Sequence, residues 1–406
     1  SCRAPEWPLT TRSRTSDTER AELRSDARMP TPTDAADVLS DDERRALRES
    51  CDRTLRGHGR RTAAEMIAEI TSLPPATLSA DEYGQGGAVA VLEGEVRELL
   101  DKPAAVFMPS GTMAQQIALR IHADRTGRRV VAFHPTCHLE LHEDKAYQRL
   151  HGLVGRPLGD GRELLTLADL KAVREPLAAL LIELPQREIG GRLPAWDELV
   201  AQVGYARSAG AAVHLDGARL WESGPFYDRP LSEVAGLFDS VYVSFYKGLG
   251  GLAGSMLLGD EDVITEARAW RSRHGGTLHD LWPYAAAGLA GLRLRLPRME
   301  AYVAHAQAIA GALSSADGVA VVPDPPQTPM MHLHLRTDAA AVTAGIRRLA
   351  SEQRLWTWGG SSATDAPGTR RVELDVGDAT LLLTPDDVAS AVRALLPDEI
   401  NVVFQP

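Results

Sequence analysis

One lysine, Lys247, stands in the stretch SFYKGLGG, between an apolar run and a cluster of glycines. The run SVYVSF predicts a buried strand, so the amine should enter a partly dry cleft where that strand ends. Loss of water lowers the pKa of an amine and makes it nucleophilic. Such a lysine can form a Schiff base with an aldehyde, and Gly248, Gly250 and Gly251 leave room for a flat ring. The alternative is a lysine whose stem packs while its charge reaches solvent.

A carboxylate and a guanidinium follow a second apolar run. The segment AAVHLDGAR predicts a strand that ends in Asp216, with Arg219 three residues later. In open α/β sheets ligands gather at the carboxyl ends of the strands, so both groups should lie at the same edge as Lys247. Because Asp-Gly is a common turn dipeptide, a turn aspartate beside a surface arginine is the alternative interpretation.

The third element is an anion site. The predicted strand AAVFMP is followed by Ser110, Gly111 and Thr112, and then by the helical segment MAQQIALRIHAD. The free N–H groups and the dipole at a helix N-terminus attract phosphate, Gly111 permits close approach, and the hydroxyls add donors. Alternatively, Ser110 or Thr112 is an ordinary helix cap.

Together these three sites match the requirements of one cofactor. Pyridoxal phosphate (PLP) needs an anion cradle, a carboxylate opposite its pyridine nitrogen and a lysine on its aldehyde. An ionised Asp216 would keep the ring nitrogen protonated, so that electrons released at a substrate α-carbon spread into the ring. The sequence therefore predicts PLP as the cofactor.

The segments FMPSGTMAQ, HLDGARL, SFYKGLGGLAGSMLLG and ARAWRSRHGG resemble the threonine aldolase and aromatic β-eliminating lyase superfamily. This resemblance runs from about Leu55 to the C-terminus. It implies the aspartate aminotransferase fold, fold type I, in a divergent branch. It also implies that Lys247 is the Schiff-base lysine, Ser110, Gly111 and Thr112 hold the phosphate, Asp216 faces the ring nitrogen and Arg219 contacts the ring oxygen or the substrate carboxylate.

The resemblance adds a histidine. The family stacks an imidazole on the cofactor ring ahead of a glutamate, and CHLELHE supplies His138 and Glu143 at that interval. His138 is therefore a candidate both for cofactor binding and for catalysis. His134, His138 and His142 recur every four residues, but without a known zinc signature we predict no metal and expect His134 and His142 to belong to a wet or packed face.

The substrate site departs from the family pattern. Members carry a Ser-Asp-Thr run near their start, where this chain reads LRGHG and offers His58. In place of a histidine after the fourth strand it has Gln186, Arg187 and Glu188. The small-domain arginine has no clear counterpart, since Glu373, Asp375 and Asp378 stand near its position, and His279 replaces a further arginine of many relatives. The candidate substrate-binding residues are thus His58, Gln186, Arg187, Arg219 and Arg371, with Arg370 as a neighbour in shifted register.

The pattern of apolar runs and helical segments that must position these residues predicts an α/β fold with a mostly parallel sheet. Seven strands are predicted, at AAVFMPS, RRVVAFHP, GLVGRPL, AALLIELP, AAVHLDG, SVYVSF and AGSMLLG, with helices between them. We expect a flexible tail over residues 1–40, a large PLP-binding domain over 41–290 that starts with a helix capped by Ser40, and a small α+β domain over 291–406. The small domain should contain a long helix over RLRLPRMEAYVAHAQAIAGAL and short strands near VAVVP, MMHLHLR and RRVELDV.

Composition narrows the class of protein. The 406 residues carry 44 basic and 55 acidic side chains, a net charge of −11, which favours neither nucleic acid nor an anionic membrane. Three scattered cysteines suggest neither disulfides nor a metal site, and a reducing compartment fits best. There is no apolar run of about 20 residues and no secretory signal pattern, so we expect a cytoplasmic protein.

The expected activity is a PLP-dependent lyase that cleaves a β-hydroxy-α-amino acid, such as threonine, to glycine and an aldehyde. The alternatives are β-elimination from an amino acid with a leaving group, or a non-catalytic protein that keeps the fold. The expected partner is an amino acid substrate. By resemblance, we expect a homodimer or homotetramer with active sites at the dimer interface, and Tyr83 is either an interface residue or an ordinary loop tyrosine.

Overall fold

The computed structural model describes residues 38–397. Of these, residues 39–397 form one compact unit. The tail expected over residues 1–40 lies almost wholly outside the described residues. No helix within residues 38–397 is long and apolar enough to cross a membrane.

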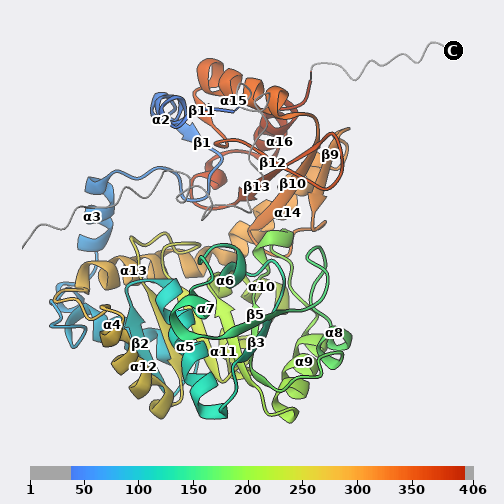
Figure 1. The fold of residues 1–406 in the computed structure, drawn as a ribbon. Coiled ribbons are helices and arrows are strands. Elements are labelled where there is room, and N and C mark those ends of the chain that lie inside the picture. Colours follow the sequence, from blue (N-terminus) through green and yellow to red (C-terminus); the bar gives the residue numbers. More distant parts are fainter. Residues whose placement is uncertain (1–37, 398–406) are drawn as a thin grey trace, which may run out of the picture. The chain divides into compact units, whose positions relative to one another are not determined.

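A seven-stranded sheet forms the centre of this unit, with the strand order β2-β8-β7-β6-β5-β3-β4 (Figure 1). β8 pairs antiparallel with both of its neighbours, and all the other pairs are parallel. The mostly parallel sheet predicted from the sequence is thus confirmed, and each strand falls within a predicted run except that β5 begins one residue before its run. The bounds are β2 Ala104–Met108, β3 Val130–Phe133, β4 Val154–Pro157, β5 Leu177–Glu183, β6 Ala212–Gly217, β7 Ser240–Ser244 and β8 Ser255–Gly259.

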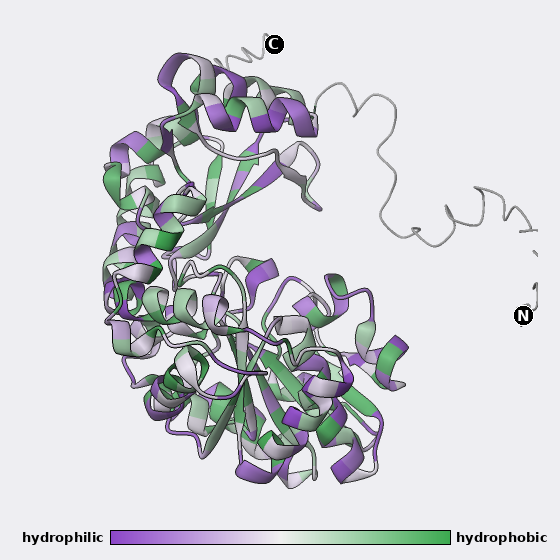
Figure 2. Ribbon diagram, turned by 90° about the vertical axis from the view of Figure 1, so that its left-hand side faces the viewer, coloured by the Kyte–Doolittle hydropathy of each residue, from purple (hydrophilic) through white to green (hydrophobic). Residues whose placement is uncertain are grey.

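Helices cover both faces of the sheet, which explains why its strands are apolar almost throughout. On β2, Val106 and Met108 pack on α5 and α12, whereas Ala105 and Phe107 point to the opposite face and its core. Figure 2 shows the apolar strands between helices that carry polar residues outward. The helices around the sheet are α4 Gly87–Leu99, α5 Gly111–Thr126, α6 His138–Leu141, α7 Ala146–His151, α8 Leu167–Lys171, α9 Trp196–Ser208, α10 Gly224–Tyr227, α11 Leu231–Gly236, α12 Glu261–Arg273 and α13 Trp282–Arg295.

The C-terminal part contains an antiparallel sheet in the order β12-β13-β10-β9, which confirms the three predicted strands and adds the short β12. Its strands are β9 Val319–Val322, β10 Met330–Arg336, β12 Ser362–Ala363 and β13 Thr369–Asp375, and its helices are α14 Met299–Leu313, α15 Ala339–Gln353 and α16 Pro385–Arg393. The predicted long helix is interrupted. α13 ends at Arg295, a 3₁₀ turn spans Leu296–Arg298, and α14 begins at Met299, because Pro297 lacks the N–H that a continuous helix needs.

The N-terminal segment joins this C-terminal part. α2, Asp41–Ser50, is capped by Ser40, whose hydroxyl accepts from the Glu43 N–H at 3.2 Å, as predicted. β1, Arg53–Thr54, pairs with β11, Leu355–Trp356, and α3 follows at Ala63–Thr71. The division into domains at about residue 290 stays a prediction. The β1–β11 pair places residues 53–54 beside the predicted small domain. Other 3₁₀ turns are Pro75–Thr77, Arg187–Ile189, Leu220–Glu222 and Thr380–Leu382.

One buried carboxylate fixes the start of α13. Asp81 accepts hydrogen bonds from the N–H groups of Gly84, Leu281 and Trp282, at 2.7, 2.8 and 2.6 Å. A negative charge at a helix N-terminus is favourable, so Asp81 caps α13 from 200 residues away in the chain.

Replacing this carboxylate should destabilise the fold. We expect Asp81→Ala to lower the free energy of unfolding by about 2–3 kcal/mol, because hydrogen bonds to a buried charge are lost. Urea unfolding followed by circular dichroism measures the change. Glu82→Ala, at the exposed neighbouring residue, is the control, and equal stabilities of the two variants would contradict this account.

Candidate active site

Lys247, Asp216, Arg219 and His138 line one small cavity at the carboxyl edge of the central sheet. β2, β6 and β7 all end at this edge, because β8 runs antiparallel to both β2 and β7. Lys247 and Arg219 also line a larger cleft of about 520 Å³. The structure therefore brings together four residues that the sequence singled out separately.

The backbone around Lys247 turns sharply after β7. The Gly250 N–H donates to the carbonyl of Lys247 at 2.9 Å, and the Gly251 N–H donates to the carbonyl of Phe245 at 2.7 Å. Burial lowers the pKa of the Lys247 amine, while the carboxylate of Asp216 acts in the opposite direction. A partly desolvated amine of this kind is a better nucleophile than a surface lysine.

The glycines after Lys247 make room for other parts of the protein. A Cβ at Gly248 would lie 2.4 Å from a carboxylate oxygen of Glu222, and one at Gly251 would lie 2.8 Å from the carbonyl of Phe245. Gly250 has a φ of +66°, which glycine adopts without strain. These contacts therefore show that glycine is needed here for close packing of the loop against the protein. They do not show the space for a flat ring that the sequence suggested.

Asp216 is buried at the end of a hydrogen-bonded chain of side chains. Gln115 donates through Nε2 to a carboxylate oxygen of Asp216, and its Oε1 lies 2.9 Å from Nε2 of His214. Nδ1 of His214 lies 2.7 Å from the hydroxyl of Ser240, which in turn lies 2.7 Å from Nε2 of His122. All five side chains are almost fully buried.

The direction of each hydrogen bond in this series of side chains follows from the first one, between Gln115 and Asp216. Because Gln115 donates its amide N–H to Asp216, its oxygen accepts from His214, whose other nitrogen then accepts the Ser240 hydroxyl proton. Ser240 then accepts from Nε2 of His122, so both histidines carry a proton on Nε2, and burial keeps both of them neutral. Burial lowers the pKa of His122 to about 4 and the pKa of His214 to about 3. The whole chain thus directs donors toward the Asp216 carboxylate.

The periods of helix α5 and strand β6 explain why these side chains meet. Gln115 and His122 are seven residues apart and so lie on one face of α5. His214 and Asp216 are two residues apart and so share one face of β6, where His214 is in register with Ser240 of β7.

His138 opens α6 and is held by a second pair of polar side chains. Its Nδ1 lies 3.1 Å from Oε1 of Glu143, whose other oxygen accepts from Nε2 of Gln116 at 2.7 Å. The hydrogen bond with Glu143 raises the pKa of His138 against the effect of burial. The interval between His138 and Glu143 that the sequence suggested is thus a contact in the structure.

Glu183 is a pocket residue that the sequence analysis missed. It ends β5, is in register with Asp216, and accepts from the N–H groups of His138 and Arg187 at 3.0 and 3.2 Å. Burial and the nearby Asp216 raise the pKa of Glu183 to about 7. The strand-end rule that pointed to Asp216 applies equally to Glu183 and would have found it.

The two arginines of the cavity are paired with carboxylates from β13. Arg219 Nη1 lies 3.1 Å from Glu222 and 3.3 Å from Asp375, and Arg187 Nε lies 3.0 Å from Glu373. Against the effect of burial, Asp375 and Glu222 raise the pKa of Arg219. Nε of Arg219 is buried without a hydrogen-bond partner in the described part of the chain, so its guanidinium retains an unused donor.

The predicted anion site lies at the start of α5. Ser110 caps this helix through its hydroxyl, which accepts from the Met113 N–H at 3.3 Å, and its carbonyl accepts from the Ser255 hydroxyl at 2.9 Å. A Cβ at Gly111 would lie 2.0 Å from the hydroxyl of Tyr242, so only glycine fits. Gly111 and Thr112 occupy the first turn, where backbone N–H groups have no intrahelical acceptor. The donors that a phosphate group requires are therefore present.

Three of the candidate substrate-binding residues do not line the Lys247 cavity. His58 lines the larger cleft, but both of its ring nitrogens contact protein atoms, the Gly248 carbonyl and the Asp378 backbone N–H. Gln186 is buried, donates to the Thr136 carbonyl at 3.3 Å and borders a separate small cavity. Arg371 contacts Glu188 and lines a different cleft. The other two candidates, Arg187 and Arg219, line the Lys247 cavity.

The other histidines that the sequence analysis singled out contact protein groups. His134 Nε2 lies 2.7 Å from the Glu163 carbonyl, and His142 Nε2 lies 3.1 Å from Glu188. His279 lies against Tyr83, with ring centroids 5.1 Å apart. Over residues 38–397, no group of three or more His, Cys, Asp or Glu side chains is placed to hold a metal ion.

Known proteins resemble this chain over most of its length. The profile of the family described as Beta-eliminating lyase matches residues 62–337. Low-specificity L-threonine aldolase 1 of Arabidopsis thaliana is 25% identical over 295 residues, which cover 70% of this chain and 82% of the plant protein.

Two solved structures share the fold at higher identity. One, a proposed aromatic amino acid beta-eliminating lyase/threonine aldolase from Exiguobacterium, is 38% identical with a TM-score of 0.81 and covers 87% of this chain and 99% of its own. The other, a proposed L-allo-threonine aldolase from Listeria monocytogenes, is 39% identical with a TM-score of 0.81, over 87% and 98% of the two chains.

The two buried histidines predict a dependence of stability on pH. In the unfolded chain they gain protons as pH falls below about 6.5, whereas in the folded chain they resist protonation down to about pH 4 and 3. Stability is therefore complete above pH 6.5 and lost as pH falls, by about 2 kcal/mol for each histidine between pH 7.5 and 5.

His122→Gln tests this, because glutamine can donate to Ser240 without titrating. We expect the variant to lose about 2 kcal/mol less than the wild type over the same pH interval, as measured by urea unfolding at both pH values. An equal loss in the two proteins would show that His122 is not held neutral.

Proposed function

The chain belongs to the beta-eliminating lyase family, and we propose that it is a PLP-dependent lyase that cleaves the Cα–Cβ bond of a β-hydroxy-α-amino acid. The products would be glycine and an aldehyde, and the reaction would be reversible. The threonine aldolases among its relatives support this choice of reaction. The observation that carries the proposal is the convergence of Lys247, Asp216 and His138 on one cavity.

The residues present fit PLP. Lys247 would bind the aldehyde, Asp216 would accept a hydrogen bond from the pyridine nitrogen, and the start of α5 at Ser110, Gly111 and Thr112 would hold the phosphate. His138 would lie against the ring. When bound, PLP accepts the electron pair released at the α-carbon of an attached amino acid.

The chain's own side chains would divide the proton transfers between them. Cleavage requires removal of the β-hydroxyl proton, formation of the aldehyde C=O, and later addition of a proton to the α-carbon. Since Glu143 occupies Nδ1 of His138, Nε2 is the ring nitrogen left to take the hydroxyl proton, directly or through water. Lys247, whose pKa burial lowers, can carry a proton to or from the α-carbon.

Arg219 is the proposed ligand of the substrate carboxylate. It borders the cavity of Lys247, and its Nε is an unused donor. Its Nη1 lies 3.1 Å from a carboxylate oxygen of Glu222. Asp375, from the C-terminal part of the chain, lies 3.3 Å from the same Nη1 atom. The Asp375 side chain is 34% exposed. Asp375 would therefore compete with the substrate carboxylate for Arg219.

We further propose that the protein works as a homodimer or homotetramer, with active sites at the dimer interface. Tyr83, 49% exposed, is the proposed interface residue. Sedimentation of wild type and Tyr83→Ala at several concentrations tests both statements.

Product analysis tests the reaction. With L-threonine or L-allo-threonine, the PLP-loaded protein should release glycine and acetaldehyde in equal amounts, and Lys247→Ala should reduce this to background. His138→Ala should lower kcat by about 10²–10⁴-fold. Lys171→Ala, at an exposed lysine, is the control. Ammonia and a keto acid would instead indicate β-elimination, and a Lys247→Ala protein as active as wild type would reject the mechanism.

Removing the competing carboxylate should improve substrate binding. Asp375→Asn keeps the size of the side chain but not its charge, so we expect KM to fall by about threefold to tenfold with little change in kcat. Asp317→Asn, which breaks an exposed ion pair with Arg336, controls for the loss of charge. A rise in KM for Asp375→Asn would mean that this carboxylate helps to bind substrate.

A further inference from the structure

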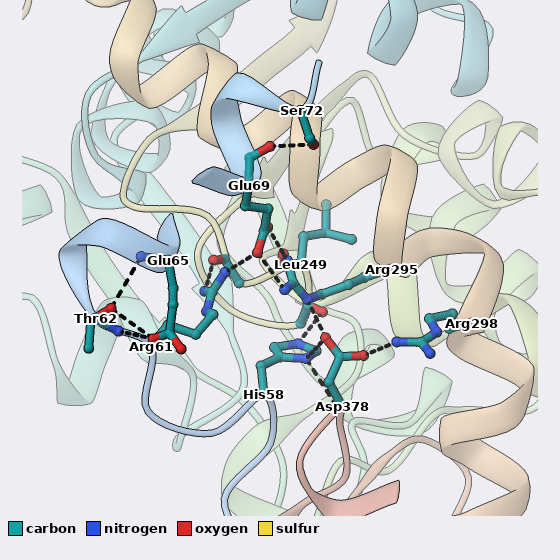
Figure 3. Close-up of polar contacts among 12 residues, drawn as sticks. His58, Arg61, Thr62, Glu65, Glu69, Ser72, Leu249, Arg295, Arg298 and Asp378 are labelled. Atoms are coloured by element: carbon teal, nitrogen blue, oxygen red, sulfur yellow. Dashed lines mark hydrogen bonds and ion pairs between the residues drawn. The ribbon is translucent and has the colours of Figure 1, made fainter. Parts of the chain in front are cut away.

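Three successive carbonyls after Lys247 are each held by a side chain from elsewhere in the fold (Figure 3). His58 Nε2 lies 2.8 Å from the Gly248 carbonyl, and Arg295 Nη1 donates to the Leu249 carbonyl at 3.0 Å. Arg61 donates through Nη2 to the Gly250 carbonyl. We call His58, Arg61 and Arg295 the carbonyl clamp.

Two carboxylates tie the clamp together. Glu69 accepts from Arg61 at 2.8 Å and from Arg295 at 2.7 and 3.0 Å. Asp378 accepts from Arg295 Nε at 2.8 Å, and its backbone N–H donates to Nδ1 of His58 at 3.3 Å. The network thus joins the segment before α3, the end of α13 and the turn after β13 to the loop that carries Lys247.

The clamp is well placed to be rigid. Only 3% of the Arg295 side chain and 12% of the His58 side chain are exposed. Burial alone would raise the pKa of Asp378, but hydrogen bonds with His58 and Tyr302 and the charge of Arg295 hold it below its ordinary value. Charge-assisted hydrogen bonds in a poorly hydrated site are stronger than those between neutral groups at a surface.

The contacts also place a proton on Nε2 of His58, because this atom lies 2.8 Å from the Gly248 carbonyl oxygen, which can only accept. Nδ1 faces Asp378, 3.3 Å from its backbone nitrogen and 3.4 Å from a carboxylate oxygen. One ring therefore bridges the turn at Asp378 and the residue next to Lys247. The loop itself has glycine at 248, 250 and 251, so it has little stiffness of its own.

We propose that the carbonyl clamp is the positioning device of Lys247. His58, Arg61 and Arg295 do not touch the reacting atoms; they hold the backbone from Gly248 to Gly250 so that the lysine amine stays aimed into its cavity. This inference rests on the proposed role of Lys247 as the cofactor-binding lysine. It gives His58 a positioning role in place of the substrate-binding role that its place in the sequence suggested.

Two substitutions at His58 separate positioning from general stability. In His58→Gln the amide nitrogen stands about where Nε2 stood and keeps the bond to Gly248, whereas in His58→Asn it stands about where Nδ1 stood and loses that bond. In the PLP-loaded full-length protein, we expect His58→Asn to lower kcat by about 10- to 100-fold with KM little changed. His58→Gln should remain within about twofold of wild type.

Hydrogen exchange supplies a readout that does not depend on activity. The N–H groups of Gly250 and Gly251 donate to Lys247 and Phe245 inside the loop, so their exchange reports how often it opens. We expect exchange to accelerate about fivefold to tenfold in His58→Asn, and not in His58→Gln. The visible absorption band of bound PLP should shift or broaden in the asparagine variant alone.

Two further variants keep the test decisive. Arg298→Gln removes another partner of Asp378 that does not touch the loop, and should behave as wild type in all three readouts. If His58→Asn does not fold, Arg61→Met, which frees the Gly250 carbonyl, should accelerate the same two amides. Equal exchange and equal kcat in His58→Gln and His58→Asn, or unchanged exchange in Arg61→Met, would overturn the proposal. Altered exchange in a protein without lyase activity would instead reject the proposed function and leave the clamp standing.

Discussion

A carboxylate buried beside a lysine amine is the interaction on which the site depends. Asp216 is only 1% exposed, and burial raises its pKa, while Lys247 and His138 act in the opposite direction. An ionised carboxylate in such surroundings needs donors directed at it. Gln115 and the Ala218 N–H supply them. Hydrogen bonds that run through the neutral His214, Ser240 and His122 orient Gln115. The ability of Asp216 to remain charged is thus built into α5, β6 and β7 together.

Lys247 is fixed from the opposite side. The strand before it lies in the central sheet, whereas the loop after it is held by His58, Arg61 and Arg295. His58 also contacts Asp378, and Asp375 pairs with Arg219, so the C-terminal part of the chain contacts residues around Lys247 at two points three residues apart. The lysine, the arginine and the turn after β13 are therefore coupled through direct contacts.

The sequence was informative where the chemistry follows local pattern. Apolar runs located all seven strands of the central sheet, and strand ends located Asp216 and Lys247, because both signals depend on neighbouring residues. Family resemblance located His138 with Glu143, which meet at 3.1 Å. Fold type I was implied by that resemblance, whereas PLP was predicted from the three strand-end sites, and both agree with the family match.

Contacts between distant segments could not be predicted in the same way. The chain of His122, His214 and Ser240 needs the register of β6 on β7 and the facing side of α5, none of which a single sequence specifies. Gln186 follows a strand end and yet turns to the Thr136 carbonyl, and Arg371 is drawn to Glu188. A hydrogen bond to the backbone decided the orientation of Gln186, and charge pairing decided that of Arg371. Charge pairing also decided the orientation of Arg187, whose partner Glu373 is 186 residues away in the chain.

The central claim is that Lys247 alone, of the four lysines in the chain, binds the cofactor aldehyde. Lys102 donates to the Phe238 carbonyl, Lys145 pairs with Glu140, and Lys171 is exposed, whereas Lys247 lines the cavity with Asp216. Borohydride reduction of the PLP-loaded protein, followed by peptide mass spectrometry, tests this directly. The account predicts a phosphopyridoxyl group on the peptide that contains Lys247. Stoichiometric labelling of Lys102, Lys145 or Lys171 in its place would contradict it.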